Sequence, residues 1–144
     1  MTAVVWVHEE ALRADHPVFQ AAPDARSVFC WDKVYLDHAN IGLNRQLFIY
    51  ECLVPLDVDI FAGTAASIFA ALAKQDAITE IFMADTPNQL LHAELDRVGQ
   101  AVPGSRVTLV PDRPFVQMDT PPELGRFHRY WNKARKAALR PSGR

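Results

Sequence analysis

The sequence predicts an α/β fold: a Rossmann-like open sheet of five parallel strands in the order 3-2-1-4-5, with helices on both faces. Three observations lead to this prediction. Short apolar runs alternate with helical segments through short connections, which is the rhythm of βαβ units joined by right-handed crossovers. The first run, Ala3–Val7, contains no polar residue, as is typical of a central strand buried on both faces. A length of 144 residues suits one domain, 1–144, with a substantial core.

The expected strands are the five apolar runs. They cover Ala3–Val7, Arg26–Trp31, Val58–Ala62, Glu80–Ala84 and Arg106–Val110. After the first strand, Pro17 suits the first turn of a short helix through Ala22, because that turn does not use the N–H that proline lacks. After the second strand, Lys33–Asn40 is expected to be a polar connection, and a helix follows over residues 41–54. Its apolar residues recur near helical spacing at Leu43, Leu47, Tyr50 and Val54.

Capping residues predict the next two helices. Gly63 provides a tight turn, and Thr64 is expected to cap the helix Ala65–Lys74. Residues 86–89 (T-P-N-Q) have the pattern of a capping box with Thr86 as the N-cap. The helix that this box opens is expected to stop at Gly99, because glycine suits the left-handed position just past a helix end.

The C-terminal part of the chain is expected to be an amphipathic helix with a basic tail. After an irregular connection over residues 111–122, a capping box that begins at Thr120 predicts a helix to about Leu139. Aromatic residues fall on one side of it and basic residues on the other. The interaction surface predicted there comprises Phe127, Tyr130, Trp131, Arg129, Lys133 and Lys136.

Charge is divided unevenly along the chain. Residues 1–125 carry 8 basic and 17 acidic side chains, whereas residues 126–144 carry 7 basic side chains and no acidic one. A basic segment of this kind favours an acidic partner, either nucleic acid through non-specific contacts or an acidic protein surface. A solvated helix face is the alternative interpretation.

Composition points to an ordinary soluble protein of the cytoplasm. Apolar residues make up 49% of the chain and charged residues 22%. No window has the roughly 18 consecutive apolar residues of a membrane span, and no signal peptide is visible at the N-terminus. The two cysteines, Cys30 and Cys52, lie in apolar contexts and are expected to be reduced core residues, as in a cytoplasmic protein.

Several kinds of site lack their sequence motifs. Neither G-x-G-x-x-G nor G-x-x-x-x-G-K-[ST] occurs, and Glu9 and Glu10 follow the first strand where a phosphate-binding loop would lie. The five histidines form no metal-ligand pattern, and no G-x-S-x-G motif of a hydrolase is present. We therefore expect no metal, and a nucleotide site at the first βα turn is disfavoured.

Polar residues after the strands are the candidate ligand-binding residues. In an open α/β sheet, ligands bind beyond the carboxyl ends of the strands, where the strand order reverses. The candidates are His8, Glu9, Glu10, Trp31, Asp32, Asp85 and Thr86. His8 with a neighbouring glutamate could transfer protons, and Trp31 could stack on a flat ring. The alternatives are a solvated loop for residues 8–10, a buried aromatic for Trp31 and helix capping for Thr86.

Three segments resemble the DNA photolyase/cryptochrome family. Residues 5–10 (V-W-V-H-E-E), followed by 15–17 (D-H-P), resemble the family's opening, W-F-R-x-D-L-R-x-x-D-N-P. Residues 127–133 (F-H-R-Y-W-N-K) resemble the F-T-P-F-x-x-x-W segment that ends the same domain. Between them, residues 60–63 (I-F-A-G) are similar to the family's element of a strand followed by glycine. The resemblance follows the chain in order from first strand to last helix.

The resemblance implies an antenna-type domain. In that family the domain is Rossmann-like and holds a light-harvesting chromophore such as a folate (a pterin), a flavin or a deazaflavin. A larger helical domain, which follows in photolyases, binds FAD and the damaged DNA. This implies that the present chain would not bind FAD and would have no deoxyribodipyrimidine photo-lyase activity alone, so that light-dependent repair would require a separate helical partner.

A second hypothesis is a non-enzymatic interaction protein without a chromophore. The sheet edges and last helix, which pack on the helical domain in two-domain relatives, would here need another cover. A symmetric homodimer or another partner protein would supply it. A nucleotide-binding α/β domain is a further hypothesis, which the acidic first turn disfavours.

Overall fold

The computed structural model describes residues 2–114, 131, 132 and 135. Residues 1–112 form one compact unit and residues 113–144 a second. In the second unit, Trp131, Asn132 and Arg135 have helical backbone conformation. The other residues of the helix predicted between Thr120 and Leu139 lie outside the described residues. The candidate site belongs to the first unit, whose fold is given below.

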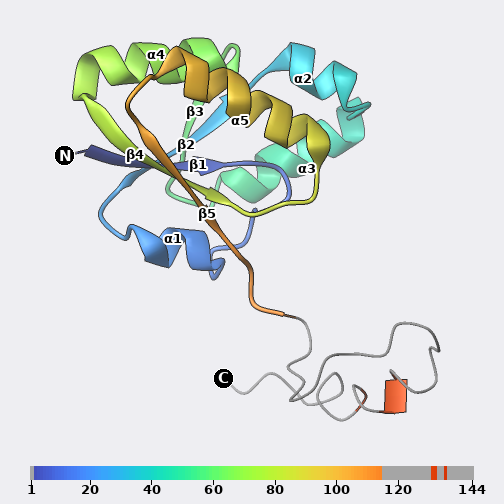
Figure 1. Cartoon of the computed structure of the whole chain (residues 1–144). Helices are drawn as coiled ribbons and strands as arrows, with labels where there is room; N and C mark the ends of the chain where they lie inside the picture. The colour runs from blue at the N-terminus through green and yellow to red at the C-terminus, as the bar shows by residue number, and fades with distance from the viewer. Residues whose placement is uncertain (1, 115–130, 133–134, 136–144) are drawn as a thin grey trace. The chain divides into compact units, whose positions relative to one another are not determined.

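The first unit contains a parallel sheet of five strands (Figure 1). They are β1 Thr2–Val7, β2 Arg26–Trp31, β3 Asp59–Ala62, β4 Ile78–Ala84 and β5 Arg106–Val110. The sheet order is β3-β2-β1-β4-β5, and every neighbouring pair is parallel. This confirms the predicted fold class and strand order. The reversal of order next to β1 places the carboxyl ends of β1 and β4 side by side, at the position where open α/β sheets bind ligands.

Between residues 2 and 114, five helices pack around the sheet. They are α1 Pro17–Ala21, α2 Lys33–His38, α3 Leu43–Leu53, α4 Ala65–Asp76 and α5 Gln89–Ala101. Within the part of the chain that the structure describes, none of the helices is long and apolar enough to span a bilayer.

Helix α2 corrects one prediction, because residues 33–40 were expected to be a polar connection. The Asp32 carboxylate accepts a hydrogen bond from the Tyr35 N–H at 3.1 Å and so caps the first turn. Tyr35 and Leu36 are buried and hold the helix against the core. Two buried residues in a six-residue helix are too few to give a clear helical period in the sequence.

Helix α5 corrects the predicted positions of both of its ends. Its N-cap is Asn88, whose side chain accepts the Leu90 N–H at 3.0 Å, rather than Thr86. Thr86 Oγ1 instead accepts the Asn88 N–H at 3.0 Å, one step before the helix begins. Gly99 lies inside the helix, which continues to Ala101 because the Val102 N–H still bonds to the Val98 carbonyl.

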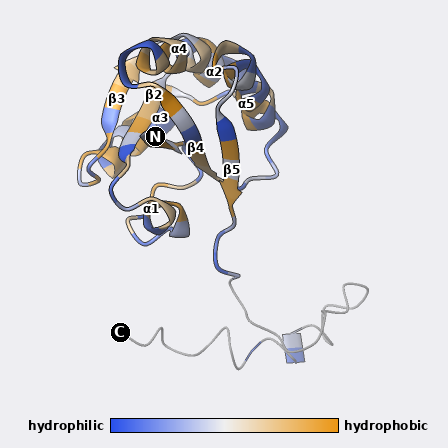
Figure 2. Ribbon diagram, turned by 60° about the vertical axis from the view of Figure 1, so that its left-hand side comes forward, coloured by the Kyte–Doolittle hydropathy of each residue, from blue (hydrophilic) through white to orange (hydrophobic). Residues whose placement is uncertain are grey.

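The central strand β1 is buried on both faces over Val4 to Val7, as predicted. Figure 2 shows helices on both sides of the sheet. Side chains alternate along β1. Val4 and Trp6 pack in one cluster with residues of α4 and α5, whereas Val5 and Val7 pack in another with residues of α1, α2 and α3. This alternation is the two-residue period of a strand, and it places helices on both faces.

Helix α3 turns an unexpected side toward the core. Its fully buried residues are Ile49 and Leu53, each 1% exposed. The apolar residues recognised by their spacing in the sequence are all exposed: Leu43, Leu47, Tyr50 and Val54. The helix therefore has two apolar stripes, of which only one faces the sheet.

Candidate functional site

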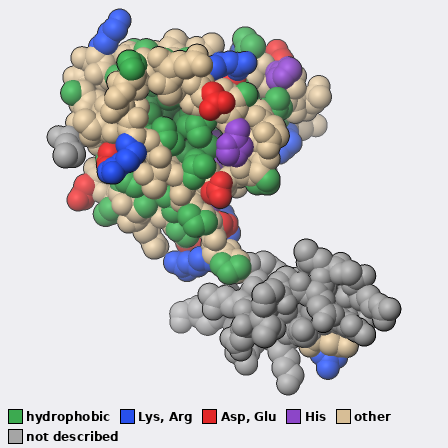
Figure 3. All heavy atoms as spheres, viewed as in Figure 1, with side chains coloured by type: hydrophobic (Ala, Val, Ile, Leu, Met, Phe, Trp, Pro, Cys, Tyr) green, Lys and Arg blue, Asp and Glu red, His purple; other side chains and the backbone are tan. Residues whose placement is uncertain are grey.

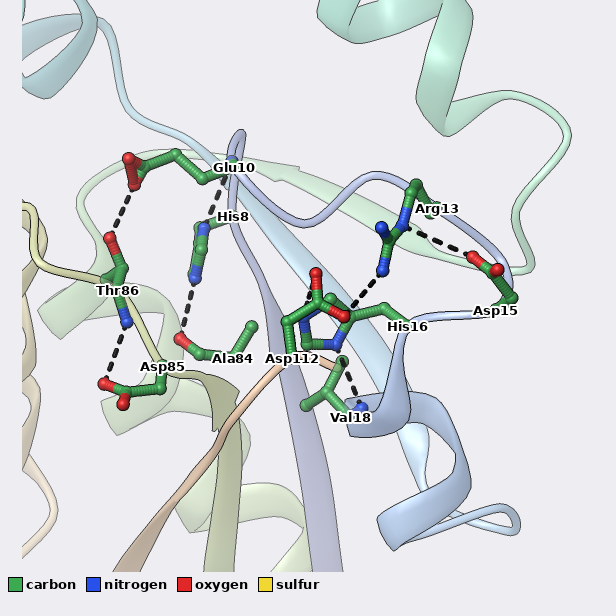
Figure 4. Close-up of polar contacts among 10 residues, drawn as sticks. All are labelled: His8, Glu10, Arg13, Asp15, His16, Val18, Ala84, Asp85, Thr86 and Asp112. Atoms are coloured by element: carbon green, nitrogen blue, oxygen red, sulfur yellow. Dashed lines mark hydrogen bonds and ion pairs between the residues drawn. The ribbon is translucent and has the colours of Figure 1, made fainter. Parts of the chain in front are cut away.

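The predicted ligand-binding residues gather beyond the carboxyl ends of β1, β2 and β4. Figure 4 shows His8 and Glu10 on the turn after β1, close to Asp85 and Thr86 after β4. Glu9 belongs to the same turn, Trp31 is the last residue of β2, and Asp32 follows it as the N-cap of α2. The structure thus brings together residues that lie up to about 80 positions apart in the sequence, as the predicted strand order requires. Their role in binding a ligand stays a prediction.

His8 ties the end of β1 to the end of β4. Its side chain is only 2% exposed, and Nε2 lies 2.9 Å from the Ala84 carbonyl oxygen. Nδ1 accepts the Glu10 N–H at 3.2 Å. Because the carbonyl can only accept and Nδ1 is occupied as an acceptor, these partners assign the proton to Nε2. Proton transfer by His8 would require breaking one of the two contacts.

Glu10 and Thr86 form a second contact between the same two strand ends. Thr86 Oγ1 donates to Glu10 Oε2 at 2.6 Å while accepting the Asn88 N–H. The Thr86 N–H in turn donates to Asp85 Oδ1 at 2.9 Å. Thr86 is 5% exposed, so its hydroxyl is fully used within the protein. Together with the His8 contact, this hydrogen bond closes the crevice between the residues that follow β1 and those that follow β4.

Glu9 turns the other way, toward α2. The Tyr35 hydroxyl donates to Glu9 Oε1 at 2.5 Å. Burial of Tyr35, reinforced by the hydrogen bond to Glu9, raises the pKa of the phenol above its usual value. Tyr35 therefore stays protonated at neutral pH and acts as a hydrogen-bond donor that fixes the turn after β1 on α2.

A small cavity lies beneath this turn. It has a volume of about 20 Å³, with His8, Glu9, Asp32, Tyr35 and Glu94 among its polar lining residues. A space of this size holds about one water molecule, whereas small-molecule sites occupy roughly 300–1,000 Å³. Across the described residues, every buried side-chain nitrogen or oxygen has a hydrogen-bond partner. The polar groups that line the cavity are therefore engaged within the protein.

Cys30 and Trp31, at the end of β2, are held by packing. Burial, with the nearby Asp32 and Glu94 carboxylates, raises the pKa of the Cys30 thiol to about 12, so the thiol is a poor nucleophile at neutral pH. Cys30 and Cys52 form no disulfide in the structure, and both are of intermediate burial. The Trp31 ring lies 5.9 Å from Phe29 and 6.4 Å from Tyr50, edge-on to the latter. Trp31 thus packs against two neighbouring aromatic rings.

A shallow open groove lies beside the closed crevice, at the ends of β4 and β5. It measures about 360 Å³ and is lined by Asp85, Thr86, Pro87, Pro111 and Asp112. Two of these residues, Asp85 and Thr86, belong to the predicted set. Hydrophobic side chains gather in the middle of the face on which β5 lies, below α4 and α5 (Figure 3).

A cluster that the sequence did not reveal joins the loop after β1 to the end of β5. Arg13 Nη2 donates to Asp112 Oδ1 at 2.7 Å, and Arg13 Nε pairs with Asp15 Oδ1 at 3.3 Å (Figure 4). His16 is 3% exposed; its Nδ1 accepts the Val18 N–H and caps α1, and its Nε2 lies 3.9 Å from Asp112. The only sequence signal was His16 before Pro17.

The buried His16 predicts a loss of stability at mildly acidic pH. Burial lowers the pKa of His16 below 6.5, and Asp112 only partly offsets this shift. Below pH 6.5 the unfolded chain binds the proton more readily than the folded one. Stability is therefore fully present above about pH 6.5 and declines as the pH falls toward the folded-state pKa. Urea denaturation at a series of pH values measures this decline.

His16→Asn is the matched control, because asparagine retains the helix cap but does not titrate. Its free energy of unfolding should fall less between pH 7 and pH 5 than that of the wild type. Equal slopes for both proteins would assign the decline to other groups.

The predicted surface of the C-terminal helix lies almost entirely outside the described residues. Phe127, Arg129, Tyr130, Lys133 and Lys136 belong to the undescribed part. Trp131 is described, with 36% of its surface exposed. Among the described residues, no group of three or more histidine, cysteine, aspartate or glutamate side chains is placed to hold a metal ion.

Comparison with known proteins adds no family to these observations. Neither a protein-family model nor a curated protein matches the chain. The resemblance to the photolyase/cryptochrome family therefore rests on the residues of this sequence alone and stays a prediction.

Proposed function

We propose that this protein is a non-enzymatic interaction domain. The observation that carries the proposal is the closed crevice between β1 and β4. His8 bonds to Ala84, and Glu10 bonds to Thr86, so three polar side chains in the usual ligand position of the fold are used within the protein. The cavity below them has room for about one water molecule.

The surface of α3 supports the same proposal. Five large apolar side chains of this helix or its end are about half exposed or more, between 49 and 80%. They are Leu43, Leu47, Phe48, Tyr50 and Val54. A contiguous apolar patch on a soluble domain usually marks an interaction site. The domain thus combines a closed small-molecule position with an exposed protein-binding surface.

Ligand retention tests this function. We expect the purified full-length protein to show no near-ultraviolet or visible absorbance beyond that of its aromatic residues. After incubation with FMN, a deazaflavin, folate or ATP and then dialysis, it should retain none of them, and its melting temperature should not change. Stoichiometric retention of any of these compounds would overturn the proposal.

A photolyase-related antenna domain is the second candidate. Its support is the strand order, which agrees with the Rossmann-like domain implied by the sequence resemblance, and the open groove that includes Asp85 and Thr86. A folate, flavin or deazaflavin in this groove would lie against the exposed Asp85 carboxylate. Asp85→Arg should then abolish chromophore retention, whereas Asp24→Arg, at another exposed aspartate, should leave it unchanged.

A further inference from the structure

The exposed stripe of α3 has the spacing of a helix–helix seam. Leu43, Leu47, Tyr50 and Val54 are separated by four, three and four residues. This is the alternation of the apolar positions that pack two helices together in a coiled coil. We call these four residues the α3 seam. Phe48 lies beside the seam and is 61% exposed.

We propose that the α3 seam is the interface of a symmetric homodimer, in which the helices of two copies pack against each other in antiparallel directions. This inference rests on the proposed interaction function and names its partner as a second copy of this chain. A two-fold axis across the helix gives both copies the same contact surface, as isologous dimers require.

The seam is complementary to itself. In the antiparallel arrangement, Leu43 of one copy meets Val54 of the other at each end, and Leu47 meets Tyr50 toward the middle. None of these positions carries a charge, so no charge is desolvated along the contact line. In the antiparallel direction, the positive end of each helix dipole also lies beside the negative end of the other, which is favourable.

The exposed area is sufficient for a dimer. The four seam residues and Phe48 expose between 49 and 80% of their surfaces. At roughly 150–250 Å² for a large aromatic side chain and somewhat less for leucine or valine, they present about 500 Å² per copy. A pair would bury about 1,000 Å², which reaches the size at which specific interfaces begin.

The seam is also held in place before any partner binds. Ile49 and Leu53, on the neighbouring stripe of α3, are 1% exposed and anchor the helix in the core. The Tyr50 ring packs edge-on against Trp31 at 6.4 Å between centroids. A surface already ordered by such contacts loses little conformational entropy on association.

Sedimentation equilibrium of the full-length chain tests the dimer. The wild type should reach twice the monomer mass as its concentration rises. Leu47→Glu places one charge from each copy in the apolar seam and should weaken dimerisation at least about 100-fold. Because Leu47 is 56% exposed, this variant should keep the wild-type circular dichroism spectrum and melt cooperatively.

Val34→Glu is the matched control. It makes the same type of change at a helical residue that is 73% exposed but lies on α2, so it should leave the dimer intact. A wild type that stays monomeric, a Leu47→Glu dimer of unchanged affinity, or equal weakening by both variants would each overturn the inference. If the wild type is monomeric and retains no chromophore, only the homodimer is excluded. The proposed interaction function is overturned only by retention of a ligand.

Discussion

Replacing Phe69 with alanine should lower the free energy of unfolding by about 3–5 kcal/mol, the usual loss for a buried phenylalanine. Phe69 is completely buried on α4, and its ring lies 5.2 Å from that of Trp6 on β1. The same cluster contains Ile81 and Met83 of β4. Truncation would therefore leave a cavity between the helix layer and the central strands. Urea denaturation monitored by circular dichroism measures the loss.

Phe48→Ala is the control for this prediction. The same side chain is removed, but Phe48 is 61% exposed on α3, so the expected change in dilute solution is within about 0.5 kcal/mol. Comparable losses for the two variants would mean that α4 does not form the centre of this side of the core.

The second large effect is expected at Leu53. Leu53→Ala should destabilise the protein by about 2–5 kcal/mol, because this residue is 1% exposed and packs in the cluster on the α1 and α3 side of the sheet. Leu47→Ala, six residues earlier on the other stripe of the same helix, should change stability by no more than about 0.5 kcal/mol. Thermal and urea denaturation in dilute solution compare the two leucines directly.

This pair of variants decides which stripe of α3 faces the sheet. A larger loss at Leu47 than at Leu53 would contradict the observed orientation of the helix. It would also remove the basis for the α3 seam as a surface that is free to bind a second copy.

The strands could be predicted because their signal is local. In β1, four consecutive residues from Val4 to Val7 are buried, and such an unbroken run is recognisable without knowledge of the neighbouring strands. The parallel pairing then follows from the alternation of strands with helices. The strand order was predicted from the usual topology of open α/β sheets, in which the first strand is central. The strands thus depend on patterns that a short stretch of chain carries by itself, whereas their order depends on the topology of the fold class.

The helix ends were harder to predict, because several nearby residues can supply the same cap. Thr86 and Asn88 are both suitable N-cap residues, and they stand two positions apart. In the structure Asn88 is the N-cap, and the Thr86 hydroxyl instead donates a hydrogen bond to Glu10, a residue 76 positions away. Asp32, which caps α2, could have predicted that helix from the sequence. The polar residues between 33 and 40 instead favoured a connection without a helix.

The candidate site was predicted in position but not in its contacts. The strand order was enough to bring the turn after β1 next to the residues after β4. It did not reveal that His8 would bond to a carbonyl oxygen of β4, or that Tyr35 would donate to Glu9. These hydrogen bonds depend on side-chain distances of a few tenths of an ångström, which residue types alone do not specify.

By itself, the sequence determined the fold class and the five strands, because hydrophobic periodicity and the alternation of elements are properties of short consecutive segments. The strand order was predicted from the usual topology of that class. The tertiary structure alone decided which side of α3 is buried. Leu43 and Leu47 repeat at helical spacing as well as Ile49 and Leu53 do, so local pattern could not choose between the two stripes. Packing against the sheet covers one stripe and leaves the other exposed. The closure of the crevice was decided in the same way, by contacts between residues distant in the chain.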